Sequence, residues 1–466
     1  MSLDNSACIL HIGIDDFDSY QYGCTTHAAT HLLHRLVDRF RIAFIDYPNL
    51  VRLNPSIPWK TRGNGAVALR ISVECSKVQD IVDYCRRVLL EYCDSISSTL
   101  DLSLSTHDVE PGLVIVANTI PSIMAEIYTK ALSDVVLPSI VIEKLMRYRN
   151  VYLIDVFKNR GVVGASAAIG WFLAGGDYTY ELLTYRSKKL YGMRRCIEID
   201  SVKEFDEISR SSTFNNIDDE SGRILIESHG ADPVLYGVRG ESPEAVRMSL
   251  NIIKTCEPIV AWTVFRSNQA TDAHGISRNI DELRMYTTAK LHAVIISRPE
   301  VLPGGAVMVK AFDATGSIDL VFFKPSTLTS IAMDLNIGDE IIVQGHVKPW
   351  GKTMVFHVEK IQVVDIKSRY MCRAPRCQVC KKRVEKMGLG KGYRCKRCDV
   401  NIVNPELDCE QLPRVVEQKL YIPPARMQKH LIKPLSRYGK EKIWKPLVTN
   451  IELAHISQII EPLWFL

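Results

Sequence analysis

The sequence predicts a multidomain α+β protein with a zinc ribbon in its C-terminal third, and three observations support this expectation. Strands and helices alternate through the first 270 residues, five short apolar runs follow, and two Cys-x2-Cys pairs stand after them. A chain of 466 residues, 46% of them hydrophobic and 24% charged, has room for several cores. The expected segments are residues 1–150, 151–270, 284–366, 367–403 and 404–466.

Residues 1–150 are predicted to form an α/β domain. An apolar strand leads through an acidic turn into a helix whose apolar residues, from Ala28 to Phe40, recur at three- and four-residue steps. The chain around Pro48, Pro55 and Pro58 is predicted to be a basic loop, because prolines so close together exclude a helix. The predicted strands are residues 9–14, 41–46, 66–73 and 112–117, and a second helix covers residues 78–92.

Residues 151–270 show two successive strand-helix-strand passes, a pattern that predicts a ferredoxin-like α+β sandwich. The predicted strands are residues 151–157, 178–185, 196–199, 224–227 and 234–238, with helices at 165–174 and 202–209. The polar composition of residues 266–281 predicts a linker. Five apolar runs between residues 289 and 364, separated by glycine-containing turns, then predict an OB-type barrel.

Carboxylates and hydroxyls gather just past the first predicted strand. Open α/β sheets bind ligands at the carboxyl ends of their strands, and carboxylate oxygens suit Mg²⁺ carrying a nucleotide phosphate. At the start of the next helix, free N–H groups and the helix dipole favour an anion. Together these features indicate a phosphate-handling site, although the acids alone suit a turn and the threonines alone suit an N-cap. The residues are Asp15, Asp16, Asp18, Gly23, Cys24, Thr25 and Thr26.

The segment of residues 60–65 is a second candidate for phosphate contacts, because it combines two cations with a flexible turn. An ordinary Asn-Gly hairpin with solvated flanks explains the same spacing equally well. The candidate residues are Lys60, Arg62, Gly63, Asn64 and Gly65. Further along, the pair Gly161 and Gly164 before a predicted helix indicates close helix packing rather than a ligand site.

Two Cys-x2-Cys pairs, fourteen residues apart, predict a zinc ribbon. Each pair supplies two thiolates to one tetrahedral zinc, and the intervening residues form a hairpin. Four buried free thiols are the alternative, but the segment has almost no apolar residues to bury them. The ligands are Cys377, Cys380, Cys395 and Cys398. By contrast, His27, His31 and His34 are better explained by a polar helix face than by metal binding, because no cysteine or carboxylate shares their spacing.

Charge is segregated along the chain. Residues 367–445 carry twenty-one Lys or Arg and seven acids, a balance of +14, although the whole chain has a net charge of +5. We therefore expect the C-terminal third to bind a polyanion. After the ribbon, nine Lys or Arg are interleaved with Tyr421, Tyr438 and Trp444, a mixture that favours RNA or DNA binding over a solvated charged face.

Cysteine use and hydropathy predict a cytoplasmic protein. The nine cysteines outside the ribbon are scattered singly, without a disulfide framework, which fits a reducing compartment. They are Cys8, Cys24, Cys75, Cys85, Cys93, Cys196, Cys256, Cys372 and Cys409. No signal peptide and no run of eighteen apolar residues is present, so we expect no membrane insertion.

Six motifs stand in order along the chain. They are Ile12-Gly13-Ile14-Asp15-Asp16, Gly23-Cys24-Thr25-Thr26, Arg52-Leu53-Asn54-Pro55, Lys60-Thr61-Arg62-Gly63-Asn64-Gly65-Ala66-Val67, Asp177-Tyr178-Thr179-Tyr180-Glu181-Leu182, and His229-Gly230-Ala231-Asp232-Pro233-Val234-Leu235-Tyr236-Gly237-Val238-Arg239-Gly240. The set resembles the archaeal tRNA(isoleucine) 2-agmatinylcytidine synthetases, the agmatidine-forming enzymes, over nearly the whole chain. Phe17 and His27 depart from the family pattern, which has Thr and an aromatic residue there.

The resemblance implies a kinase-like domain, a ferredoxin-like domain, an OB fold and a zinc ribbon, in agreement with the pattern. It also implies a ligase that replaces the C2 oxygen of the wobble cytidine with agmatine. The substrate would be an isoleucine tRNA with a CAU anticodon, ATP would be consumed to AMP and phosphate, and the cytidine would first be phosphorylated. A non-catalytic nucleic-acid-binding protein with an OB fold and a zinc ribbon is the alternative. Such a protein does not need three carboxylates beside a helix N-terminus that favours phosphate binding.

The resemblance also implies roles for individual residues. Asp15, Asp16 and Asp18 would hold Mg·ATP, and Thr25 would become autophosphorylated. Residues 62–65 would contact phosphate. Agmatine carries two cationic ends, so its pocket needs carboxylates or carbonyls. The candidates are Asp177, Glu181 and Asp232.

Overall fold

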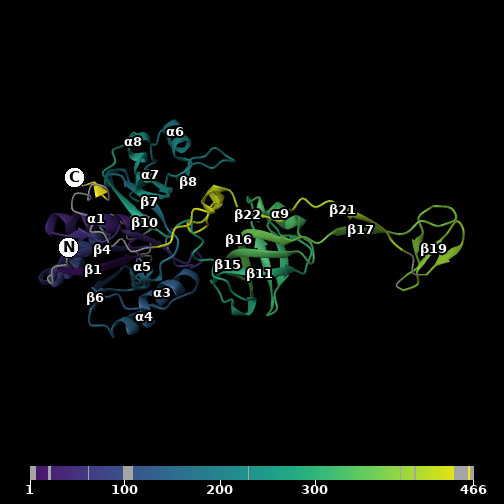
Figure 1. Cartoon of the computed structure of the whole chain (residues 1–466), viewed down its shortest axis with the longest axis horizontal. Helices are drawn as coiled ribbons and strands as arrows, with labels where there is room; N and C mark the ends of the chain where they lie inside the picture. The colour runs from purple at the N-terminus through teal and green to yellow at the C-terminus, as the bar shows by residue number, and fades with distance from the viewer. Residues whose placement is uncertain are drawn as a thin grey trace.

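One sheet of eleven strands runs through the first two predicted segments, at one end of an elongated molecule (Figure 1). The computed structural model describes residues 7–18, 23–60, 62–97, 109–228, 230–388, 390–403, 406–444 and 460–461. Thr61 and His229 of the predicted motifs, and most of the chain after residue 444, lie outside these ranges. The main strand order is β6-β5-β1-β4-β3-β10-β7-β9-β8.

The N-terminal part of this sheet lies between two layers of helices. Helices α1 and α2 cover one face, and their apolar residues share a core with Leu10, Ile12 and Leu69 of the strands. Helices α3 and α5 cover the other face around Val114 and Trp171. The elements are β1 (Ala7–Asp15), α1 (Thr25–Arg39), β2 (Ala43–Phe44), β3 (Asn49–Arg52), β4 (Gly65–Glu74), α2 (Val78–Ser97), β5 (Gly112–Ala117), α3 (Ile123–Ser133), α4 (Pro138–Leu145), β6 (Val151–Lys158) and α5 (Val162–Ala174).

The second part of the sheet carries its helices on a separate core. Its elements are β7 (Thr179–Tyr185), α6 (Ile199–Ser209), β8 (Thr213–Phe214), β9 (Val234–Gly240), α7 (Pro243–Arg247), α8 (Ser249–Ile252) and β10 (Ala261–Ser267). The two parts join where β10 pairs in parallel with β3, through Arg266 opposite Asn49 and Ser267 opposite Leu50. Strand β6 pairs with β5, so the beginning of the second predicted segment belongs to the first part of the sheet. The short strand β23 (Ile460–Glu461) also pairs with β10.

Two connections differ from the sequence prediction. The proline-punctuated segment was predicted to be a loop, but it contains the central strand β3, because the six residues between Pro48 and Pro55 are free of proline and can pair. The first part of the segment predicted as a linker is largely buried, with Asn268 and His274 at 0% exposure, whereas Ser277, Asn279 and Asp281 are exposed. The Asn268 side chain is satisfied inside the protein, because it bonds to the backbone N–H and carbonyl of Arg52.

The predicted OB-type barrel is confirmed, and all five apolar runs form its strands. Strand β15 pairs with β11 and β16, β16 pairs with β14, β14 with β13, and β13 with β11, which closes the barrel. The elements are β11 (Thr288–Ile295), β12 (Glu300–Val301), β13 (Val307–Phe312), β14 (Ser317–Phe322), α9 (Leu328–Asp334), β15 (Glu340–Trp350) and β16 (Thr353–Asp365).

A two-stranded neck, β17 (Arg369–Arg373) paired with β21 (Asp408–Leu412), carries the cysteine-rich ribbon away from the barrel (Figure 1). The ribbon consists of β18 (Glu385–Lys386), β19 (Tyr393–Cys395) and β20 (Val400–Ile402). Residues 413–444, here called the strap, then return along the barrel. The strap pairs with it through β22 (Leu420–Tyr421) and ends beside the first sheet, where Trp444 lies 3.6 Å from the Arg266 guanidinium.

Six cysteines that were predicted to be single form three disulfides: Cys8–Cys75, Cys196–Cys256 and Cys372–Cys409. The prediction was wrong for these residues because the partners lie 67, 60 and 37 residues apart and leave no local pattern. Strand pairing brings them together, and Cys372 and Cys409 are direct partners across the neck. Over the described residues, no helix has both the length and the apolar character needed to span a membrane.

Candidate active site and zinc centre

The three predicted aspartates gather where β1 ends, at a cavity between the first helix layer and α5. Asp15, Asp16 and Asp18 line this first cavity together with Thr25 and Arg160. Helix α5 packs closely against them at residue 164, where a glycine leaves room for the Asp15 side chain. A Cβ atom there would lie 1.8 Å from Asp15 Oδ2, and one at Gly161 would lie 2.6 Å from the Asp15 carbonyl oxygen. The predicted role of these two glycines in close packing is therefore confirmed.

Two carboxylates of this cluster, those of Asp15 and Asp16, are difficult to ionise. Burial, followed by the charge of Asp16, raises the pKa of Asp15 well above its usual value. Burial also raises the pKa of Asp16 to about 6, although Arg160 opposes the shift through an ion pair of 2.7 Å. Desolvation thus outweighs the charge of the Arg160 guanidinium. A bound divalent cation would restore the ionised form of Asp15 and satisfy its charge.

The start of α1 lies against the aspartates as predicted, but its first N–H group is already bonded. The Thr25 N–H donates to the Asp18 carboxylate, and the Phe17 N–H donates to Thr25 Oγ1 at 3.1 Å. Cys24 is the N-cap residue and makes no side-chain capping bond, so neither threonine is a plain N-cap. Thr25 and Thr26 are both buried, and the Thr26 hydroxyl lies 3.0 Å from Cys24 Sγ.

The loop of residues 60–65 separates the first cavity from a second one. Lys60 and Asn64 line the first cavity, Arg62 and Gly63 line the second, and Gly65 lines both. Arg62 and Asn64 have positive φ angles of 38° and 48°. The Arg62 side chain donates to the Gly23 carbonyl at 2.8 Å and pairs with Asp232 at 3.2 Å, so the loop is held in place rather than solvated.

The second cavity, of about 330 Å³, lies between the two parts of the sheet and the strap. Its volume is within the range of small-molecule sites, roughly 300–1,000 Å³. Its charged lining residues are Asp18, Glu181, Glu227, Asp232, Arg52, Arg62, Arg239 and Arg426. Thr25 and Asp18 line both cavities, so the threonine hydroxyl stands on a shared wall.

The predicted agmatine carboxylates have different surroundings. Glu181 lies between Arg52 at 3.4 Å and Arg239 at 3.2 Å, and Asp232 lies between Arg62 and Arg195. Both line the second cavity. The structure does not bring Asp177 to that cavity. Asp177 instead binds the strap, through Arg437 at 3.1 Å and the backbone N–H of Lys442.

Sequence reasoning missed three features of these cavities. Arg160 pairs with Asp16, and its only sequence signal is a cation placed directly before the Gly161 turn. Glu227 lines the second cavity and makes no ion pair with any residue that the structure describes. The third feature is the strap, which supplies part of the wall of the second cavity.

The strap was predicted to bind nucleic acid, but most of its cations form ion pairs within the protein. Seven of its Lys and Arg residues pair with carboxylates: Arg414 with Asp339, Lys419 with Glu417, Arg426 with Asp218, Lys429 with Glu359, Lys433 with Glu441, Arg437 with Glu241, and Lys442 with Glu241. Lys440 donates to the Ser211 carbonyl, and Lys445 lies outside the described residues. Most of these acids belong to the remaining, acidic part of the chain, and nucleic-acid binding by the strap stays a prediction.

The histidines of α1 do not form the polar helix face that the sequence predicted, because His27 and His34 are buried. His27 is buried, with Nδ1 at 3.0 Å from the Tyr92 hydroxyl, and burial lowers its pKa to about 3. Among the described residues, only the four ribbon cysteines bring three or more ligand atoms close enough together to hold a metal ion by themselves.

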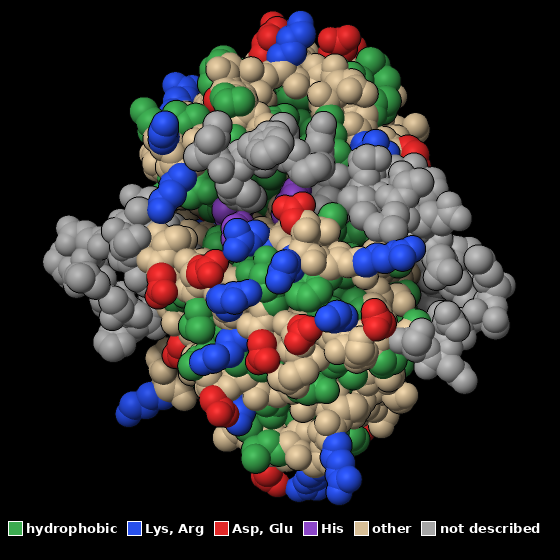
Figure 2. Space-filling model, turned by 90° about the vertical axis from the view of Figure 1, so that its left-hand side faces the viewer, with side chains coloured by type: hydrophobic (Ala, Val, Ile, Leu, Met, Phe, Trp, Pro, Cys, Tyr) green, Lys and Arg blue, Asp and Glu red, His purple; other side chains and the backbone are tan. Residues whose placement is uncertain are grey.

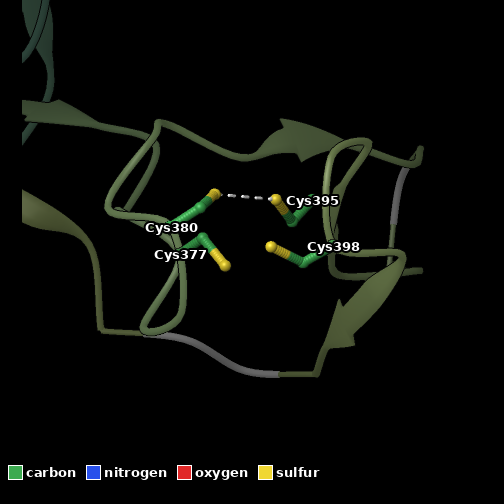
Figure 3. A group of neighbouring side chains, drawn as sticks. All are labelled: Cys377, Cys380, Cys395 and Cys398. Carbon is green, nitrogen blue, oxygen red and sulfur yellow. Dashed lines mark hydrogen bonds between the residues drawn. The ribbon is translucent and has the colours of Figure 1, made fainter.

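The four cysteine sulfurs converge as the spacing predicted, all within 4.8 Å of one another (Figure 3). Cys377 and Cys395 are buried, and the Sγ atoms of Cys380 and Cys395 lie 3.5 Å apart. Backbone N–H groups of Cys380 and Val379 lower the pKa of the Cys377 thiol to about 7, which favours the thiolate that zinc binds. This donor set fits one tetrahedral zinc ion.

The cations of the ribbon are placed differently from those of the strap. Those on its hairpin are exposed: Lys381, Lys382, Lys386, Lys391, Lys396 and Arg397. On the opposite end of the molecule, Figure 2 shows Lys or Arg side chains interspersed with Asp or Glu side chains, without a continuous area of one charge. The ribbon is therefore the better surface for a polyanion.

Family models match three parts of the chain. The TiaS TCKD domain matches residues 11–150, the TiaS FLD domain residues 159–274, and the TiaS C-terminal zinc ribbon domain residues 374–414. The chain is also similar to curated proteins named TiaS, which are 2-agmatinylcytidine synthetases of an isoleucine tRNA. It is 52% identical to that of Ignisphaera aggregans over 458 residues, covering 97% of this chain and 98% of the relative. It is 35% identical to the TiaS protein of Staphylothermus marinus over 442 residues, covering 93% of this chain and 95% of the relative.

Solved structures give the same result. A crystal structure of TiaS in complex with its isoleucine tRNA and ATP superposes with a TM-score of 0.78 at 30% identity, covering 92% of this chain and 97% of that one. A crystal structure of TiaS in complex with the same tRNA, AMPCPP and agmatine superposes with a TM-score of 0.76 at 28% identity and the same coverage.

Proposed function

The chain belongs to the TiaS family of tRNA(isoleucine) 2-agmatinylcytidine synthetases, and from this premise we propose how its two cavities share the reaction. The protein conjugates agmatine to an isoleucine tRNA in an ATP-dependent reaction. The first cavity takes the ATP phosphates, the second takes agmatine, and Thr25 stands between them. The observation that carries this division is that Thr25 and Asp18 line both cavities.

The chemistry requires two steps at neighbouring positions. A ring carbonyl oxygen is a poor leaving group, so the C2 oxygen of the cytidine is first phosphorylated at the expense of ATP. The amine nitrogen of agmatine then forms a bond to C2, the bond between C2 and the phosphorylated oxygen breaks, and phosphate leaves while the amine loses a proton. Fixed donors stabilise the negative charge that moves during each step. Lys60 and Asn64 at the first cavity and Arg62 between the cavities supply such donors.

The aspartate cluster fits magnesium held jointly with a triphosphate. Mg²⁺ is usually bound by one or two carboxylates together with substrate phosphates. The buried carboxyl of Asp15, whose pKa is raised by burial and by Asp16, is such a ligand. We assign Asp15, Asp16 and Asp18 to Mg·ATP, and Thr25 to the transient acceptance of a phosphoryl group. Mg²⁺ would neutralise phosphate charge during the transfer.

The agmatine assignment rests on the charges of the second cavity. Glu181 and Asp232 are each held between two arginines, which leaves Glu227 as the carboxylate best placed to pair with a cationic end of agmatine. Glu227 therefore joins Glu181 and Asp232 as a candidate, whereas Asp177 holds the strap.

The target base is the wobble cytidine of an isoleucine tRNA with a CAU anticodon. A base inside a stacked loop cannot reach Thr25, so it must be unstacked at a cost of a few kcal/mol. Contacts of the tRNA body with the barrel and the exposed cations of the ribbon offset this cost. Such an enzyme works in the cytoplasm with its tRNA. The three disulfides are compatible with this location if the cell is a hyperthermophilic archaeon, because the intracellular proteins of such organisms are rich in disulfides.

One assay tests the proposal directly. The protein is incubated with ATP, Mg²⁺, radiolabelled agmatine and tRNA transcripts that differ only at the wobble base. Label should enter the transcript with cytidine and no other. Label in every transcript would contradict the assignment of the base. Label in no transcript would contradict the enzymatic function and favour a non-catalytic nucleic-acid-binding protein.

Replacing Cys395 by serine should remove zinc and weaken tRNA binding. Cys395 is 2% exposed, and the fold of the ribbon depends on the metal that its thiolate would hold. We expect less than one zinc per chain by atomic absorption. We also expect tRNA affinity, measured by filter binding, to fall about tenfold or more, because the ribbon cations lose their fixed positions. Val379→Ala, an exposed position between two of the ligands, is the matched control. Unchanged zinc content in the Cys395 variant would remove the metal assignment.

A further inference from the structure

One wall of the second cavity belongs to the strap. Ala425, Arg426, Gln428 and His430 line this cavity, whereas no described residue of the strap lines the first one. The strap is fixed at this point by backbone hydrogen bonds: the N–H of Ala270 donates to the His430 carbonyl, and the N–H of Asp272 donates to the Leu431 carbonyl, both at 2.8 Å. Any effect of the strap on the reaction should therefore concern the second cavity alone.

A chain of hydrogen bonds sets the tautomer of His430. Glu181 pairs with two arginines, and a carboxylate in such pairs only accepts hydrogen bonds, so the neighbouring Gln269 side chain must present its NH₂ group to it. The Gln269 carbonyl oxygen is then turned toward His430, where it lies 2.9 Å from Nδ1. Because this oxygen is only an acceptor, Nδ1 carries the proton. Nε2 is left with a lone pair.

The imidazole also stays neutral. Burial, followed by the charges of Arg52, Arg239 and Lys60, holds the pKa of His430 well below its usual value. Nε2 lies beside Gly63, where a Cβ atom would approach it to 2.6 Å. His430 and Gly63 both line the second cavity, and no residue that the structure describes donates a hydrogen bond to Nε2. A neutral acceptor with a fixed direction is thus placed at the cavity wall.

We propose that His430 is a substrate-binding residue of the amine site, whose Nε2 accepts a hydrogen bond from an N–H group of agmatine. Glu227 and Asp18 supply negative charge to the same cavity, and His430 adds a directional acceptor without adding charge. Gln269 and Glu181 act as positioning residues, because they fix the tautomer. This inference rests on the proposed function of the second cavity, and it makes the strap part of the amine site.

The test separates the two half-reactions. In His430→Phe the KM for agmatine should rise about ten- to a hundredfold, the range for a lost hydrogen bond to a charged group. Phosphorylation of Thr25 by labelled ATP, which uses the first cavity, should stay at the wild-type rate. Lys419→Gln, a strap residue whose ion pair is with Glu417 at the surface, should change neither value. His430→Ala serves in place of the Phe variant if the larger ring prevents folding, as judged by thermal unfolding.

The positioning role has its own readout. Gln269→Met keeps the side-chain volume but frees the imidazole tautomer, so the KM for agmatine should rise by a smaller factor. The double variant with His430→Phe should be no worse than His430→Phe alone, because both changes remove the same hydrogen bond. If the effects of the two substitutions on the KM for agmatine add up, Gln269 does not act through His430, and the positioning role is wrong.

The outcomes distinguish this inference from the proposed function. If the wild-type protein transfers agmatine to tRNA but His430→Phe keeps the wild-type KM, the inference fails and the function stands. If Thr25 phosphorylation falls in parallel with incorporation, His430 is structural and the inference again fails. If the wild-type protein transfers no agmatine, the function itself fails.

Discussion

Replacing Thr25 by valine is expected to lower agmatine incorporation by about two to four orders of magnitude, the range lost when a group that acts in the chemical step is removed. Valine keeps the shape of threonine but has no hydroxyl to accept a phosphoryl group. It also leaves the buried Phe17 N–H without its acceptor, which costs about 1–3 kcal/mol of stability. Incorporation is measured with labelled agmatine, and tRNA binding, measured by filter retention, should persist.

Thr30→Val is the matched control for this variant. Thr30 is buried one turn further along the same helix, where its hydroxyl bonds to Tyr185 and Thr263 and lines neither cavity. It should lose comparable stability and keep incorporation. Retained incorporation in Thr25→Val would refute the role given to that hydroxyl, whereas equal losses in both variants would indicate a general effect on the helix.

Replacing Gly164 by alanine should inactivate the enzyme with little loss of stability. The new Cβ atom would lie 1.8 Å from Asp15 Oδ2, so the carboxylate must move away from the metal and phosphate position. A displacement of about 1 Å at a reacting group can cost about a hundredfold in rate. Because the clash involves the end of a side chain, and alanine is favoured over glycine in a helix, the fold should survive. Thr25 phosphorylation and the thermal midpoint are the two measurements.

Gly170→Ala on the same helix provides the contrast. Its Cβ atom would lie 1.9 Å from the Met124 carbonyl oxygen, which is backbone and cannot rotate away, so this variant should lose stability. Wild-type phosphorylation in Gly164→Ala would show that the Asp15 carboxylate is not needed where the structure places it.

The sequence shows where basic residues are concentrated, but the structure shows which of them are exposed. The basic C-terminal third contains two kinds of segment. The ribbon keeps its cations exposed on a neck far from the sheet, whereas the strap uses its cations to bind acids such as Asp218 and Glu241 (Figure 1). Net charge therefore indicates a polyanion partner, but only contact partners reveal which cations remain available for it.

Local signals predicted most of the elements. The helix from Thr25 and the barrel strands follow from the spacing of apolar residues, and the zinc centre follows from two Cys-x2-Cys pairs, because periodicity and ligand spacing are properties of a few neighbouring residues. The same holds for the aspartates that follow β1, whose place at a strand end marks them as site residues before any contact is known.

Contacts between distant segments left no such signal. Strand β10 joins the two parts of the sheet by pairing with β3, and Asn268 beside it bonds to Arg52 across 216 residues of sequence. The three disulfides, the pairing of Arg160 with Asp16 and the placement of His430 at the second cavity are of the same kind. The amino-acid order by itself determined most of the elements, the cysteine ligand set and the acidic turn, but not strand β3, and the strands predicted at residues 196–199 and 224–227 are only isolated bridges. Only the tertiary structure decided which side chains share a cavity, because that depends on packing between segments whose separation along the chain carries no pattern.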